Sequence, residues 1–140
     1  VLLLLALGQY MGGEGMNSNF QSVDEVIAYM RGAITNNAPH TAALKRDAIG
    51  AAARGLPWHG YEGGNWGWSN ASGLSAKVMA MFDPRMRSIV KEYMDLVYSL
   101  GMVTMNIYTG DAGVQDDKYG DWPAASDVAS PNDSPKFPLH

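Results

Sequence analysis

Three short apolar segments, separated by stretches of helical periodicity, are the feature that most constrains the fold of this chain. The segments span residues 1–10, 56–61 and 102–108, and a polar or aromatic residue ends or directly follows each of them. Strands that alternate with helices pair in parallel through right-handed crossovers. The sequence therefore predicts an α/β protein, either a small open parallel sheet or a piece of a larger barrel.

Capping signals indicate where the helices begin. Ser22 and Glu25 form a capping box in front of a segment with apolar residues at helical spacing. An Ala-rich helix is predicted over residues 39–54. Asp83 is a strong N-cap, and Pro84 suits the first position of the amphipathic helix that follows.

The apolar run at residues 1–7 has two interpretations, a buried parallel strand or a truncated leader peptide. No basic segment precedes the run and no clear cleavage site follows it, and it is too short to span a bilayer. These observations favour the strand.

Composition excludes several classes of function. The 140 residues suffice for one domain, and a net charge of −4 with scattered Lys and Arg residues argues against a nucleic-acid partner. The lack of cysteine excludes disulfides, thiolate zinc sites and a cysteine nucleophile. No metal-ligand spacing and no phosphate-binding glycine motif is present, so we expect neither a metal nor a cofactor, and no membrane partner.

Glu62 is the strongest candidate for chemistry, because function in parallel α/β proteins gathers at the C-terminal ends of strands. It follows an apolar, aromatic strand and precedes Gly63 and Gly64, which would leave its carboxylate approachable. Such a carboxylate attacks an anomeric carbon or activates water, whereas a purely structural Glu caps a turn or pairs with arginine. Side chains at the ends of the other predicted strands are expected to converge on the same site: Tyr10, Asn106 and Tyr108.

Two tryptophans, Trp66 and Trp68, lie in a predicted loop rich in Gly and Asn. Flat indole faces stack on sugar rings, and large aromatic residues in loops are typical of binding surfaces. Trp58 and Trp122 are instead predicted to pack in the interior. His59 is predicted to be a hydrogen-bonded structural residue on the opposite face of its strand from Trp58.

Residues 55–64, with the sequence GLPWHGYEGG, resemble the YEGG strand end of bacterial (β/α)₈ barrels related to clan A glycoside hydrolases. Members of this group are often described as cellulose-binding or cellulase-like. The order of the surrounding elements is also similar over most of the chain, including a Ser-x-x-Glu helix and an Ala-rich helix before the motif. The chain departs from the family near its end, where Pro123 follows Trp122 in place of glycine.

The resemblance implies that residues 1–140 form a single domain, the last third of a TIM barrel with about three βα units. The predicted strands would be the sixth, seventh and eighth of the barrel. Glu62 falls where clan A enzymes place the nucleophile of a retaining mechanism. The acid/base residue of the family ends the fourth strand, outside this sequence, so the missing N-terminal part of the barrel is an expected partner.

From the residues and the resemblance together we expect a secreted or periplasmic retaining glycoside hydrolase that acts on a polysaccharide or oligosaccharide. The alternatives are a non-catalytic carbohydrate-binding barrel or module that uses the Trp66 and Trp68 loop, and a truncated fragment without function. The residues expected to bind substrate are Tyr10, Tyr61, Trp66, Trp68, Asn106 and Tyr108.

Overall fold

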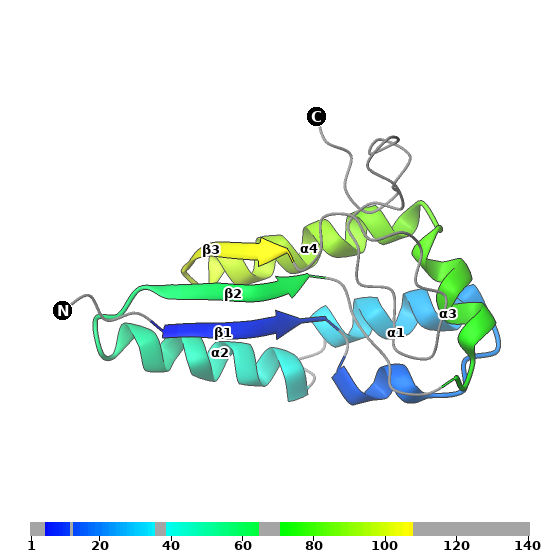
Figure 1. Cartoon of the computed structure of the whole chain (residues 1–140), viewed down its shortest axis with the longest axis horizontal. Helices are drawn as coiled ribbons and strands as arrows, with labels where there is room; N and C mark the ends of the chain where they lie inside the picture. Colours follow the sequence, from blue (N-terminus) through cyan, green and yellow to red (C-terminus); the bar gives the residue numbers. More distant parts are fainter. Residues whose placement is uncertain (1–4, 12, 36–38, 65–70, 108–140) are drawn as a thin grey trace.

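The computed structural model describes residues 5–11, 13–35, 39–64 and 71–107, and its strands and helices follow the order that the sequence predicts (Figure 1). One short 3-10 helix, η1, was not predicted. The elements are β1 (Leu5–Tyr10), η1 (Gly13–Asn17), α1 (Val23–Thr35), α2 (Pro39–Ala52), β2 (Trp58–Gly64), α3 (Leu74–Met81), α4 (Arg85–Ser99) and β3 (Met102–Ile107).

The strands form a parallel three-stranded sheet in the order β1-β2-β3, so the predicted parallel α/β architecture is confirmed. Tyr10 at the end of β1 pairs with Gly64 of β2, and Gly63 pairs with Ile107 of β3. The C-terminal ends of the strands therefore lie together at one edge of the sheet. β2 is the central strand.

The two faces of β2 have different environments. Trp58 is 2% exposed and Gly60 is buried, so this face of the strand belongs to the core, as predicted for Trp58. A side-chain carbon at Gly60 would lie 3.1 Å from Cγ of Met105 on β3. His59 is half-buried and Tyr61 is exposed on the other face, so the predicted separation of His59 from Trp58 is confirmed. We call the face that carries His59 and Tyr61 the open face.

The helices occupy two regions along the molecule. α2 and α4 run alongside the strands, whereas η1, α1 and α3 lie beyond the C-terminal ends of the strands (Figure 1). Tight turns at Gly55 (φ 62°) and Gly101 (φ 93°) join α2 to β2 and α4 to β3. The connections are thus short at one end of the sheet and long at the end where the candidate site lies. Buried residues of α4 supply much of the core: Met86, Ile89, Val90, Tyr93 and Val97.

The predicted helix caps at Ser22 and Asp83 both form, and the helix that follows Asp83 begins one residue later than predicted. The Glu25 N–H donates to Oγ of Ser22 at 3.2 Å, and Oε2 of Glu25 accepts from the N–H of Gln21 at 2.8 Å. α4 begins at Arg85, one residue later than the sequence predicts. Asp83 still caps it, because its Oδ1 accepts from the backbone N–H of Arg85 at 2.9 Å.

Replacing Asp83 with Ala is expected to lower the free energy of unfolding by about 1 kcal/mol at pH 7. Hydrogen bonds from Arg85 hold the pKa of the Asp83 carboxyl at about 2, so its contribution is complete above about pH 4 and disappears as the pH falls toward 2. Urea unfolding at pH 7 and at pH 2.5 measures the difference between the two proteins. Asp95→Ala, which breaks an exposed ion pair with Lys91, is the control and should have a smaller effect.

Candidate functional site

Glu62 lies at the C-terminal end of the central strand, where the sequence analysis places the site. Its backbone pairs with Gly8 of β1, and its side chain is half-buried. Gly63 and Gly64, predicted to begin a loop, are instead the last residues of β2. The prediction of an immediate loop is wrong because Gln9, Tyr10 and Ile107 continue the pairing on both sides.

Tyr61 is an extra residue in β2 relative to β1, and β2 also has one residue more than β3 in the same place. On one side the register passes from Leu7–Gly60 directly to Gly8–Glu62, and on the other side it shifts between Gly60 and Gly63. Such a β-bulge bends the strand and redirects the following side chain, and bulges are frequent beside active sites. Glu62 is the residue that follows this bulge and pairs again with β1.

Asn106 supports this bulge. Its Nδ2 donates a hydrogen bond of 3.3 Å to the carbonyl oxygen of Tyr61. The bulge takes that carbonyl out of the regular ladder, and the amide of Asn106 satisfies it. Asn106, expected from the sequence to bind substrate, thus has a structural contact in addition to its place at the strand end.

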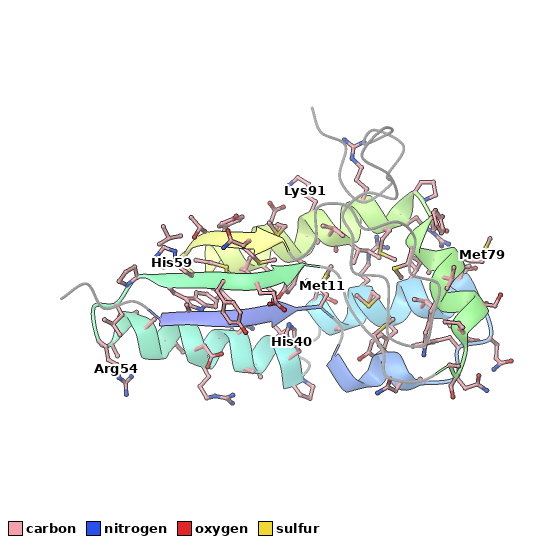
Figure 2. All side chains as sticks on the ribbon, in the orientation of Figure 1. Met11, His40, Arg54, His59, Met79 and Lys91 are labelled. Carbon is pink, nitrogen blue, oxygen red and sulfur yellow. The ribbon has the colours of Figure 1, made fainter. Side chains whose placement is uncertain are left out.

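The open face carries an exposed aromatic residue directly before Glu62 and a polar pair nearer the start of β2. Tyr61 is 58% exposed. His59 Nδ1 lies 2.7 Å from Oγ1 of Thr104 on β3, so the prediction of a hydrogen-bonded His59 is confirmed (Figure 2). This pair links β2 to β3 across the open face and fixes the orientation of the imidazole ring.

Other predicted site residues are described only in part. The backbone of Tyr10 ends β1 beside Gly64, at the same sheet edge as Glu62. Trp66, Trp68 and Tyr108 lie outside the described residues. The structure thus brings Tyr61, Glu62 and Asn106 together and places the end of β1 beside them.

A second polar contact near this end of the sheet has no counterpart in the sequence analysis. His40 Nε2, in the first turn of α2, lies 3.4 Å from the hydroxyl of Tyr93 on α4, and the two rings stack with centroids 6.1 Å apart. Burial lowers the pKa of His40 and raises the pKa of Tyr93, so both groups favour the uncharged form.

This pair predicts a pH-dependent stability. The unfolded chain protonates His40 below about pH 6.5, whereas the folded chain resists that proton. The free energy of unfolding is therefore expected to fall as the pH drops from 6.5 toward the lowered pKa, with no contribution from His40 above pH 6.5. Urea unfolding of wild-type protein and His40→Gln between pH 5 and 8 measures this, and equal slopes in both proteins would contradict it.

Within the described part of the chain, no three His, Cys, Asp or Glu side chains gather closely enough to hold a metal ion. None of the helices in that part has the length and apolar character needed to cross a bilayer.

Comparison with protein-family models, curated proteins and solved structures found no match to this chain. The fold and the site define the protein as an α/β protein with parallel strands. Its central strand carries a partly buried Glu, directly after a bulge and near the C-terminal end of the strand, beside an exposed aromatic residue.

Proposed function

We propose that this chain is the C-terminal part of a (β/α)₈ barrel glycoside hydrolase that cleaves a polysaccharide with retention of configuration. The observation that carries the proposal is the position of Glu62, one residue after a bulge at the C-terminal end of the central parallel strand. Enzymes of the barrel class place their catalytic residues at this end of their strands.

The topology supports the barrel part of the proposal. Neighbours in the sheet are also neighbours in the chain, and each pair is joined by a helical connection, as in a (β/α)₈ barrel. Among the described residues β1 and β3 are outer strands, and His59, Tyr61 and Thr104 lie on the open face. In a closed barrel the open face would face the interior, and further strands would pair with β1 and β3.

In the proposed mechanism the Glu62 carboxylate attacks the anomeric carbon while the glycosidic bond to the leaving oxygen breaks. A second carboxyl group about 5–5.5 Å away protonates that oxygen and then takes a proton from the water that releases the sugar. This acid/base group would come from the N-terminal part of the barrel. Tyr61 would hold a sugar ring beside Glu62, together with Tyr10, Trp66, Trp68 and Tyr108.

Covalent labelling tests this proposal directly. A longer polypeptide that also contains the residues encoded upstream would be incubated with 2-deoxy-2-fluoroglycosides of glucose, xylose and mannose. These compounds slow the hydrolysis of the covalent glycosyl-enzyme, so the labelled protein accumulates. Peptide mass spectrometry is expected to find the fluorosugar on Glu62. Label on a different carboxylate, or hydrolysis with inversion, would overturn the assignment.

A non-catalytic carbohydrate-binding protein is the second candidate, favoured by the exposed ring of Tyr61 on a strand end that Asn106 supports. It predicts that Trp66→Ala weakens glycan binding and that Glu62→Gln changes little. Glycan binding without turnover in the longer polypeptide would favour this candidate.

A further inference from the structure

A groove of about 500 Å³ lies where two connections meet beyond the C-terminal ends of the strands. One wall is the segment 19–23 that leads into α1, and the other is the segment 71–79 that includes most of α3. Met79 on this wall is 58% exposed and lies at the far end of the molecule from the start of β1 (Figure 2). We call this feature the distal groove.

The walls of the distal groove are held together by close packing. Gly73 has φ 62°, and a side-chain carbon there would lie 2.5 Å from the backbone nitrogen of Phe20. Only glycine fits this position, for both reasons. The ring of Phe20 packs against Tyr29, with centroids 5.6 Å apart, which holds the Phe20 side of the groove against α1.

The lining is polar but uncharged. Among the described residues that line the groove there is no Lys, Arg, His, Asp or Glu, so this part of the chain places no charged side chain to pair with a phosphorylated or carboxylated ligand. Amide, hydroxyl and apolar groups occur together on the walls, a combination that can donate and accept hydrogen bonds and also contact apolar surface. The side chains that offer these groups are Asn19, Phe20, Gln21, Ser22, Ser75 and Met79.

The amide groups are positioned by local hydrogen bonds. Gln21 Nε2 donates to the carbonyl oxygen of Asn19 at 2.9 Å, and the Gln21 N–H donates to Glu25 at 2.8 Å. The side-chain oxygen of Gln21 remains as an acceptor on the groove wall. A neutral sugar chain supplies matching donor hydroxyls and apolar ring faces.

The position of the groove, at the end of α1 far from the sheet, requires an extended ligand if the same molecule is to reach Glu62. The groove lies at the N-terminal end of α1, whose 13 residues span about 20 Å before the chain returns toward the strand ends (Figure 1). We propose that the distal groove binds an extended segment of a neutral polysaccharide, remote from the bond that is cleaved. This inference rests on the proposed function and names uncharged polymers as its substrate class.

Affinity electrophoresis in native gels tests the groove with the 140-residue chain itself. Hydroxyethyl cellulose, arabinoxylan and glucomannan are the neutral probes, and polygalacturonate is the charged one. At least one neutral polymer is expected to retard the wild-type protein, and polygalacturonate is not. Met79→Glu should weaken that retardation about tenfold or more, since it places a charge in a neutral groove. Ile49→Glu on α2 is the matched control, because Ile49 is 69% exposed and lies outside the groove.

Equal retardation of Met79→Glu and wild-type protein would overturn the proposal, as would an equal loss in Ile49→Glu or no retardation by any neutral polymer. Amide NMR spectra with cellohexaose, xylohexaose or mannohexaose locate the contact independently, with shifts expected at residues 19–23 and 73–76. Shifts confined to the sheet would also reject the groove.

Glu62→Gln separates this inference from the proposed hydrolase. The variant is expected to be retarded like wild-type protein, because Glu62 does not line the groove. If the longer polypeptide loses hydrolysis with Glu62→Gln but Met79→Glu still binds polymer, only the groove assignment fails. If Glu62→Gln still hydrolyses substrate, the proposed function fails whatever the groove binds.

Discussion

Glu62→Gln in the polypeptide that includes the upstream coding region is expected to lower turnover by about four orders of magnitude or more. The amide keeps the size of the side chain but is not a nucleophile, so no glycosyl-enzyme forms. Initial rates of reducing-end release from the polymer that binds best measure this loss. Glu92→Gln is the matched control, because Glu92 is a partly exposed carboxylate on α4 that pairs with Arg31 at 3.7 Å. Its rate should stay within about twofold of wild type.

Glycan binding is expected to survive in the same variant under either candidate function, so the loss of turnover is what separates them. A glycoside hydrolase that loses its nucleophile still holds substrate, so the Kd of an oligosaccharide for Glu62→Gln should stay within a few-fold of the wild-type value. Calorimetric titration measures that value. Hydrolysis by Glu62→Gln at the wild-type rate would exclude Glu62 as the nucleophile, whereas oligosaccharide binding without turnover by the wild-type polypeptide would leave the binding-protein candidate.

Much of the architecture was predictable because the relevant signals are local. The capping box at Ser22, the Asp83 cap and the apolar periodicity of α4 indicate helices through interactions within a few residues. Alternation of strands and helices then leaves few topologies other than a parallel sheet. The position of Glu62 at a strand end follows from the same reasoning.

The finer geometry of the site depends on contacts between segments that are distant in sequence. The bulge exists because β1 skips Tyr61 and β3 has one residue fewer than β2 between the neighbouring pairs, and the hydrogen bond from Asn106 joins residues 45 positions apart. The required glycine at position 73 depends on the backbone of Phe20, more than 50 residues earlier. Periodicity and propensity carry no information about such pairings, so neither the bulge nor the distal groove was predicted.

Trp58→Ala is expected to lower the free energy of unfolding by about 3–5 kcal/mol, a large part of the ~5–15 kcal/mol that stabilises a typical domain. The indole is 2% exposed at the start of β2, and its backbone pairs with both Leu5 and Met102. Its removal leaves a cavity between the sheet and the helices. Urea unfolding followed by far-UV circular dichroism measures the change, and an unchanged midpoint would contradict the placement of Trp58 in the core.

A second variant of Trp58 and a variant of Tyr61 test whether the buried face of β2 stabilises the fold more than its open face does. Trp58→Phe should lower the free energy of unfolding less than Trp58→Ala does. Phenylalanine fills part of the cavity and removes the Nε1–H, which is buried without a hydrogen-bond partner among the described residues.

Tyr61→Ala, three residues later on the open face, should change the free energy of unfolding by only about 0.5–1 kcal/mol, because its ring is 58% exposed. A large loss from Trp58→Ala beside a small one from Tyr61→Ala would mean that one face of β2 stabilises the fold. The other face is then available to a ligand, which is the condition that a sugar-binding role for Tyr61 requires.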